Sequence, residues 1–165
     1  LNGQLGDDTL FGWVGADLLL GDDGSDRLFG QQDDDTLFGW IGNDDLFGDD
    51  GNDTLFGQDG DDILFGWVGD DVLVAGSGFD IMDGQAGQDT YFFGQDAQVG
   101  GELDTILSYE ASDIYRFEGI DQSQVSFHTF NGVSAIDIIL GNGSVFVIDV
   151  IGATEQQLAT QIEIV

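Results

Sequence analysis

Single apolar residues recur every nine positions along the first 92 residues, set among glycines and aspartates. Ten nonapeptides follow one another from Gly3 to Phe92 without insertion, and most copies read Gly-x-x-Gly-x-Asp-x-Leu-x. Glycine tolerates turn conformations that a Cβ penalises, so positions one to six predict a tight loop. Positions seven to nine predict a short strand whose eighth side chain points to one face. A fixed short period of this composition is typical of a parallel β-solenoid.

Two loops and two strands close one coil of 18 residues, so alternate repeats stack at a strand spacing of about 4.8 Å. The expected core is a double row of eighth-position residues, in which Leu10, Leu28, Leu46 and Leu64 face Leu19, Leu37, Leu55 and Leu73. The ninth position is usually Phe, which should point outward. Three interpretations of these rings stay open: they stack on one another, fold over the strand ends, or bind a neighbouring domain or molecule.

The sixth position is aspartate in all ten repeats, and the coil places each one beside the sixth residue two repeats away. Ca²⁺ takes 6–8 oxygen ligands from carboxylates and carbonyls, so each stacked pair predicts one calcium site and the repeats predict up to eight. All 22 acidic residues of the repeat region are Asp, which fits a short side chain acting at a fixed reach. The candidate ligands are Asp8, Asp17, Asp26, Asp35, Asp44, Asp53, Asp62, Asp71, Asp80 and Asp89.

These units resemble the repeats-in-toxin (RTX) family, whose pattern is Gly-Gly-x-Gly-x-Asp-x-apolar-x. The resemblance implies an all-β fold, a right-handed parallel β-roll loaded with calcium, as found in bacterial toxins, proteases, lipases, alginate epimerases and adhesins. The second glycine of the family is here Gln, Trp or Asp in the first eight repeats, in a cycle of 27 residues. Since 27 residues make one and a half coils, Trp13 and Trp67 should emerge on one side and Trp40 on the other. Asp33 replaces the fourth glycine once, so the calcium sites at Asp35 should be weaker through strain, or tighter if Asp33 adds a carboxylate.

Residues 93–165 leave the nonapeptide pattern but stay rich in β-strand signals. Alternating or apolar runs predict strands at 104–109, 113–117, 124–130, 135–140 and 144–151, and Thr154 is an acceptable N-cap for a helix over 155–162. We therefore divide the chain into a β-roll (1–92) and a β-rich cap (93–165) that covers the open end of the solenoid. Asp104 and Asp113 either add a calcium site in this cap or only close turns.

Charge supports a calcium module. The formal net charge is −31, with Arg27 and Arg116 as the only Lys or Arg residues and no Cys. Such self-repulsion opposes compaction until cations bind, so metal binding and folding should be one coupled event. The same charge disfavours nucleic acid and anionic membranes as partners, and no apolar run approaches the ~20 residues of a membrane span.

Within the cap, the stretches Leu103–Ile106, Ser112–Phe117 and Gly119–Ile120 resemble the capping region that follows the repeats in RTX proteins. The ending Ile162 to Val165 resembles their acidic-then-apolar tail. Those proteins leave the cell by type I secretion, directed by an uncleaved C-terminal signal. The resemblance implies a calcium-dependent folding, stabilising and secretion module of a larger exported protein, often an enzyme such as a protease, lipase or polysaccharide-modifying enzyme. Its partners would be calcium, the type I secretion machinery and the N-terminal part of the same protein. Its location would be secreted or at the surface of a Gram-negative bacterium.

Leu1 and Asn2 occupy positions eight and nine of a repeat, so we expect sequence before them. No Ser/His/Asp or Cys/His arrangement is recognisable, and we expect no catalysis within this chain. The alternative function is an interaction module, meaning an adhesin, surface-layer or polysaccharide-binding segment that uses the Phe or Trp positions.

Overall fold

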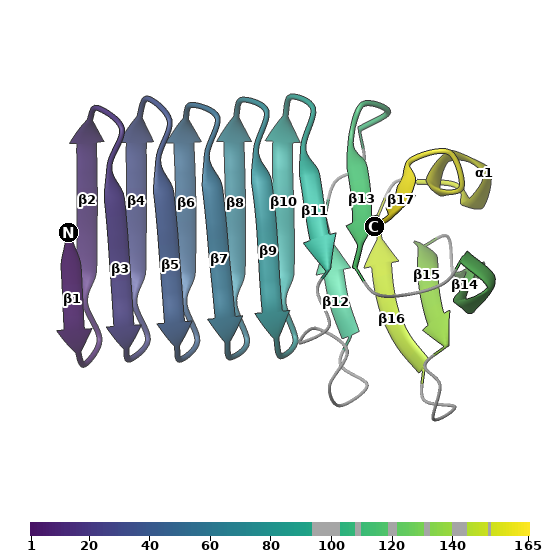
Figure 1. The fold of residues 1–165 in the computed structure, drawn as a ribbon, viewed down its shortest axis with the longest axis horizontal. Helices are drawn as coiled ribbons and strands as arrows, with labels where there is room; N and C mark the ends of the chain where they lie inside the picture. The colour runs from purple at the N-terminus through teal and green to yellow at the C-terminus, as the bar shows by residue number, and fades with distance from the viewer. Residues whose placement is uncertain (94–102, 108–109, 119–121, 131–132, 140–144, 152) are drawn as a thin grey trace.

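Two sheets of stacked parallel strands form the body of the protein in a computed structural model (Figure 1). The structure describes residues 1–93, 103–107, 110–118, 122–130, 133–139, 145–151 and 153–165. The first sheet follows the odd-numbered repeat strands: β1 (Asn2–Leu5), β3 (Leu18–Asp23), β5 (Thr36–Ile41), β7 (Thr54–Asp59), β9 (Val72–Ser77) and β11 (Thr90–Phe93). The second follows the even-numbered strands: β2 (Thr9–Val14), β4 (Arg27–Gln32), β6 (Asp45–Asp50), β8 (Ile63–Val68) and β10 (Ile81–Ala86).

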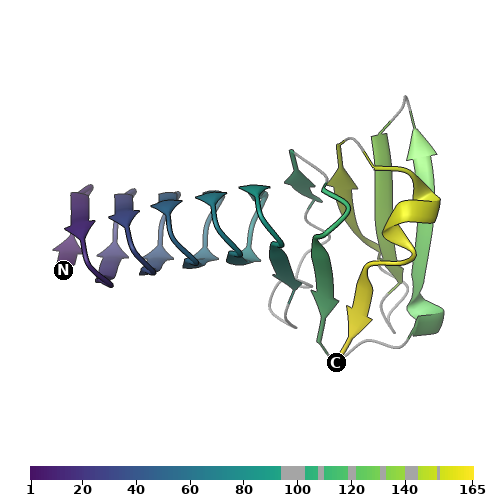
Figure 2. The same ribbon diagram turned by 90° about the horizontal axis from the view of Figure 1, so that it is seen from above.

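The strand register confirms the predicted parallel β-roll. Each residue pairs with the one 18 positions away, as in Leu28↔Leu46 and Leu37↔Leu55. Figure 2 shows the two sheets as thin facing layers that run along the solenoid toward the cap. The predicted Leu rows lie between them: the eighth-position residues from Leu19 to Tyr91 are fully buried, and Leu10 in the first coil is partly buried.

The strands are longer than the sequence pattern predicted. Most span six residues, from position seven of one repeat to position three of the next. The first-position glycines therefore lie inside strands and not in turns, which corrects our interpretation of them. Their backbone has no positive φ, and what they provide is space: a Cβ built on Gly39 would lie 2.8 Å from the carbonyl oxygen of Gly57 and would also meet the Oδ2 of Asp44.

Second-position residues adopt the left-handed conformation that the family's glycine would favour. Their φ angles lie between 64° and 82° in every repeat whose second residue is not glycine, including Trp13 (77°), Trp40 (80°) and Gln58 (82°). An L-residue in this region costs roughly 1–2 kcal/mol, so substitution of the second glycine leaves the loop geometry intact at a cost in stability. Trp13 and Trp67 lie on strands of one sheet and Trp40 on the other, as the 27-residue cycle predicted.

The outward-facing phenylalanines stack on one another, as the first of the three interpretations predicted. Along one sheet, Phe11, Phe29, Phe47 and Phe65 have ring centroids 4.9, 4.9 and 5.9 Å apart with near-parallel planes. On the other sheet, Phe38 and Phe56 stack at 4.5 Å. Rings in these ladders cover one another, so much of their apolar surface is removed from water within the chain.

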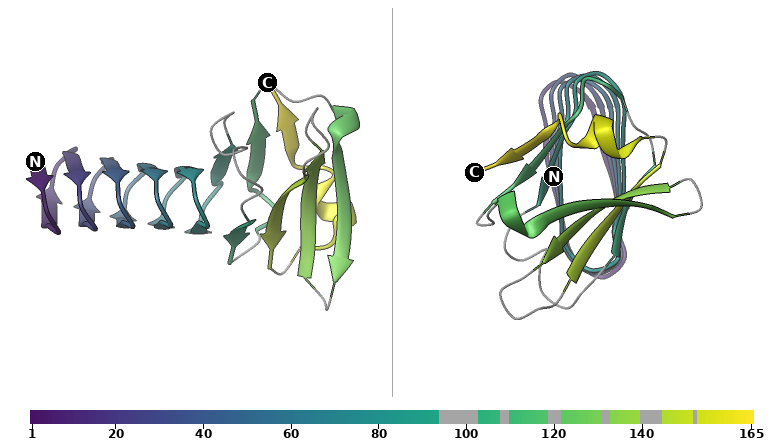
Figure 3. Two further views of the ribbon diagram at one scale, coloured as in Figure 1. Left: turned by 90° about the horizontal axis from the view of Figure 1, so that it is seen from below. Right: turned by 90° about the vertical axis from the view of Figure 1, so that its right-hand side faces the viewer.

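The cap continues both sheets and then closes one of them with a meander (Figure 3). Strands β12 (Leu103–Ile106) and β13 (Ile114–Phe117) pair in parallel with β10 and β11. Strand β16 (Val145–Val150) pairs in parallel with β12, and antiparallel pairing adds β15 (Val133–Ile139) and then β14 (Val125–Phe130), which follows a 3₁₀ turn at Gln122–Gln124. A strand lies in each of the five regions predicted in the cap, and the first strand ends at Ile106. The predicted strand residues 108, 109, 140 and 144 lie outside the described residues.

The helix predicted over 155–162 is wrong in its second half. Helix α1 spans only Glu155–Leu158, and β17 (Ile162–Ile164) is a strand that pairs in parallel with β13. An ion pair between the Arg116 guanidinium and the Glu163 Oε2, 2.7 Å apart, joins the two strands. The Val165 N–H also donates to the Phe117 carbonyl. Edge pairing in a sheet thus overrides weak helix propensity. No helix in the described part of the chain has the length and apolarity needed to span a membrane.

Candidate metal centre

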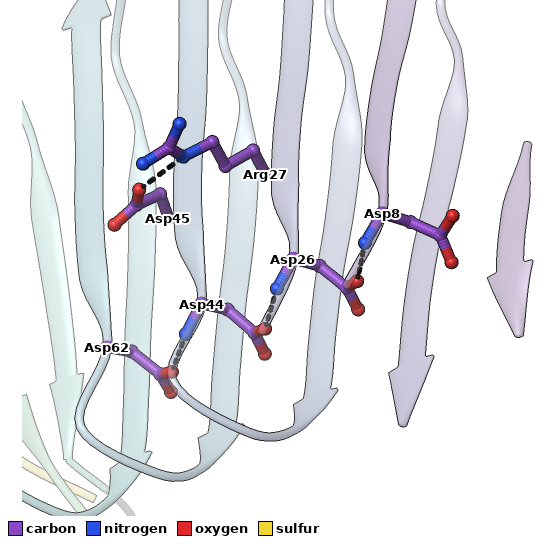
Figure 4. A network of polar contacts seen from close by, with 6 residues as sticks. All are labelled: Asp8, Asp26, Arg27, Asp44, Asp45 and Asp62. Atoms are coloured by element: carbon purple, nitrogen blue, oxygen red, sulfur yellow. Dashed lines mark hydrogen bonds and ion pairs between the residues drawn. The ribbon is translucent and has the colours of Figure 1, made fainter. Parts of the chain in front are cut away.

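The sixth-position aspartates form two continuous ladders, one along each edge of the solenoid. In each step the N–H of one aspartate donates to the Oδ1 of the aspartate 18 residues later, at 2.7 to 3.0 Å. Figure 4 shows four rungs of one ladder, with every carboxylate pointing back toward the preceding coil. One ladder contains Asp8, Asp26, Asp44, Asp62 and Asp80, and the other contains Asp17, Asp35, Asp53, Asp71 and Asp89. The structure brings together all eight pairs that the spacing predicted.

The ladder carboxylates are buried from the second coil onward. Asp8 and Asp17 are half-buried, whereas the eight that follow expose at most 2% of their surface. The second carboxylate oxygen, Oδ2, has no hydrogen-bond partner in seven of these residues: Asp26, Asp35, Asp44, Asp53, Asp62, Asp71 and Asp89. A buried ionised oxygen without a partner is costly, so each of these atoms requires a proton or a cation.

First-position glycines leave the space beside these orphan oxygens. An ideal Cβ on Gly30 would meet the Oδ2 of Asp35 and lie 2.9 Å from the carbonyl oxygen of Gly48. The same pairing of a carboxylate and a backbone carbonyl recurs at Gly21, Gly39 and Gly57. Both groups are acceptors only. The space beside each of these glycines is therefore lined by a carboxylate oxygen and a carbonyl oxygen, which are ligands that Ca²⁺ prefers.

Desolvation dominates the electrostatics of the ladders. Burial raises the pKa of Asp44 and Asp53 to about 6, that of Asp71 to about 7 and that of Asp62 to about 8. The hydrogen bond from the backbone N–H of the preceding ladder residue lowers each pKa, and the charges of neighbouring carboxylates raise it. Without a metal, the carboxyl groups of the folded ladder thus hold their protons to a higher pH than free aspartates do, and Asp62 holds its proton to the highest pH of these four. A bound cation would favour the ionised carboxylates.

A further ladder, which sequence reasoning missed, runs along the exposed fifth positions. Here the N–H of each residue donates to the side-chain oxygen of the residue 18 positions earlier, the reverse of the sixth-position pattern: Asn52 to Asp34, Asp61 to Asn43, Asp70 to Asn52, and Phe79 to Asp61. Asp and Asn serve equally as acceptors. The high frequency of Asp and Asn at this position was the available signal.

Asp33 adopts a left-handed φ of 75° in place of the expected glycine. Its carboxylate accepts the Gly15 N–H at 3.1 Å and so reinforces the loop stack. Altered calcium binding at Asp35 stays a prediction.

The described residues contain no group of three or more His, Cys, Asp or Glu side chains placed to hold a metal. A metal in the ladders would therefore need backbone carbonyls together with paired aspartates. The two arginines are engaged elsewhere, Arg27 with Asp45 at 3.0 Å and Arg116 with Glu163. The residues present fit Ca²⁺, because the donor set is all oxygen and strongly negative.

Comparisons with known proteins agree with this chemistry. A family model described as the RTX calcium-binding nonapeptide repeat (4 copies) matches residues 1–28, 20–55, 41–73 and 68–97. A search of curated proteins gave no match. Among solved structures, the AlgE6R3 subunit of the Azotobacter vinelandii mannuronan C5-epimerase is similar with a TM-score of 0.51 and 20% identity, over 90% of this chain and 80% of that one.

The extracellular lipase LipA from Serratia marcescens is also similar, with a TM-score of 0.41 and 17% identity. That similarity covers 95% of this chain and 38% of the lipase. The epimerase subunit shares the fold, and the repeat itself is a structural calcium-binding motif and not a catalytic one. With more than half of its length matched by the repeat model, this chain belongs to the family of RTX calcium-binding nonapeptide-repeat proteins.

Proposed function

We propose that this chain is a calcium-dependent folding and stabilising module of a larger exported protein, and that its C-terminal part directs type I secretion. The observation that carries the proposal is the pair of aspartate ladders, in which buried Oδ2 atoms lack hydrogen-bond partners. Up to eight Ca²⁺ ions, one for each stacked pair, would neutralise up to about +16 of the −31 charge. The ligands would be the ten sixth-position aspartates with backbone carbonyls.

Calcium supply then decides where the module folds. A chain this acidic stays expanded while free calcium is low, and it compacts where calcium is abundant, because the ion binds only the folded loops. This order suits passage through a secretion channel before folding. The C-terminal residues Ile162–Ile164 would be accessible in the expanded chain and become a sheet strand in the folded one.

Circular dichroism with and without a chelator tests the folding role. The chelated protein should be disordered or strongly expanded at pH 7.5, and the calcium-loaded protein rich in β-structure. An unchanged spectrum would refute the proposal. Export of the full-length protein with and without residues 153–165 tests the secretion role separately.

A second candidate function is an interaction module that binds polysaccharide. The observation that favours it is a row on one sheet in which Trp13, Gln31, Asp49 and Trp67 are in register, with both indoles exposed. Indole faces and polar groups at regular spacing suit stacking on sugars. Loss of binding to a glycan array on Trp13→Ala and Trp67→Ala, with Trp40→Ala on the opposite sheet as control, would support this candidate.

A further inference from the structure

The row of outward-facing phenylalanines on the odd-numbered strands is interrupted by one smaller residue. Strands β7, β9 and β11 lie side by side in one sheet (Figure 1), and their ninth-position residues Phe56, Val74 and Phe92 are in register. The next outward position of β9 is also reduced, because Gly76 lies opposite Gln58 and has no side chain. The ladder therefore lacks one ring at β9, between two rings that remain.

A hollow of about 320 Å³ lies where the ring is missing. The outward residues that line it are Phe56, Gln58, Val74, Gly76, Phe92 and Glu118. Two strand spacings separate Phe56 from Phe92, which is about 9–10 Å. A flat ring midway between them would lie about 5 Å from each, and the rings within the ladders stack at 4.5 to 5.9 Å. The hollow thus has the width of one aromatic ring.

Negative charge borders this hollow. Glu118 is exposed at its rim, and none of the described residues that line it is Lys or Arg. The two arginines of the chain pair with carboxylates elsewhere. The faces of the Phe56 and Phe92 rings carry the negative part of the ring quadrupole, which attracts a positive charge. Both features favour a ring with a positive charge over a neutral or anionic ring.

We propose that this hollow is a binding slot for a small aromatic cation. One flat ring would lie between Phe56 and Phe92 and over Val74, with its charged group toward Glu118. The volume supports a small ligand, because about 320 Å³ is near the lower limit of small-molecule sites. The slot goes beyond the calcium function, since the aspartate ladders follow the edges of the solenoid and the slot lies on the outer face of a sheet.

The ring slot combines residues of the roll and of the cap. Its ring walls belong to the repeat strands β7 and β11, whereas Glu118 directly follows β13 of the cap. The Glu118 N–H donates to the Phe93 carbonyl at 3.1 Å, which fixes this residue beside the last repeat. The site is therefore complete only when the cap is packed on the roll.

Benzamidinium and benzamide test the slot, because they share a flat ring and differ in charge. In an NMR titration of the calcium-folded protein, benzamidinium should bind at one site with millimolar affinity. Benzamide should bind roughly threefold to tenfold more weakly. Glu118→Gln should remove most of this difference between the two compounds. Asp61→Asn, an equal charge change at an exposed loop position, is the matched control and should preserve it.

Filling the slot from within the chain tests its place. Val74→Phe supplies the ring that the ladder lacks, so it should abolish benzamidinium binding and keep the circular dichroism of the parent. Leu20→Phe is the matched control, because it adds a ring to the same row beside Phe38, outside the slot. That variant should bind benzamidinium as the parent does.

Unchanged benzamidinium binding in a folded Val74→Phe variant would overturn the slot, and so would an equal loss in Leu20→Phe. If Val74→Phe fails to fold, Phe92→Leu decides, because it removes one ring wall, and binding equal to the parent's would overturn the slot. Equal affinities for benzamidinium and benzamide would overturn the assignment of a cationic ligand. A folded parent that responds to calcium but binds neither compound would refute the slot alone, whereas a parent that binds no calcium would refute the proposed function.

Discussion

Replacing Asp62 by asparagine should change the stability of the fold in opposite directions without and with calcium. Asp62 is fully buried, and its Oδ1 accepts the Asp44 N–H at 2.8 Å while its Oδ2 has no partner. Asparagine keeps an acceptor for the Asp44 N–H and removes the ionisable group. The substitution therefore isolates the charge from the hydrogen bond.

The calcium-free effect follows from the pKa of Asp62, which burial raises from 3.8 to about 8. At pH 7 the folded state holds this proton and the unfolded state does not, so stability from this group is present below pH 3.8 and is lost as pH rises toward 8. Protonating a group of pKa 3.8 at pH 7 costs about 4 kcal/mol. Asp62→Asn avoids that cost and should stabilise the calcium-free fold by up to about 4 kcal/mol at pH 7, with no gain below pH 4.

With calcium the sign reverses. Asp62 belongs to two stacked pairs, with Asp44 and with Asp80, so the substitution weakens two proposed sites. Calcium stabilises the fold by mass action, and the calcium concentration at half-folding should rise roughly tenfold or more.

Circular dichroism measures both effects, through a pH titration from 8 to 4 in chelator and a calcium titration at pH 7.5. The variant should gain β-structure at a higher pH than the parent. Asp61→Asn is the matched control: Asp61 accepts the Phe79 N–H at 3.0 Å, and Asn43 and Asn52 already serve at the equivalent position. Identical pH midpoints for Asp62→Asn and Asp61→Asn would refute the claim that buried ladder carboxylates limit calcium-free folding.

Three other substitutions test separate parts of the fold. Leu46→Asp places an unpaired charge in the fully buried row between the sheets, and it should prevent folding even at saturating calcium; recovery of the β-spectrum on adding calcium would show that position eight is not core. Gly42→Ala combines a φ of 135° with a Cβ that would meet the Gly24 carbonyl, and in thermal unfolding it should lose roughly 1–3 kcal/mol more than Gly6→Ala, where φ is 98° and nothing lies within 4 Å; equal losses would argue against tight loop stacking. Gln58 has a φ of 82°, which glycine adopts without strain, so Gln58→Gly should add about 1 kcal/mol of stability and lower the calcium concentration at half-folding. A higher calcium concentration at half-folding would show that the left-handed loops carry no strain.

The sequence by itself determined the solenoid, because its contacts repeat. Each residue meets the one 18 positions away, so a nonapeptide period is enough to place Leu46 between the sheets and Asp44 in a ladder. The stacking of the phenylalanines needed the structure, since several ring positions satisfy the same period. So did the role of the first glycine, because a glycine required for space and one required for a positive φ look the same in a sequence.

The cap depended on tertiary structure for a different reason. Its contacts occur once and join residues far apart in the sequence, such as Arg116 with Glu163, so no sequence repeat predicts them. Ile162–Ile164 forms a strand because β13 offers an edge to pair with, although the local sequence also suits a helix. Likewise the sequence left open whether Asp113 adds a calcium site or closes a turn, and only the structure shows its loop stacked on that of Asp89, whose N–H donates to the Asp113 Oδ1.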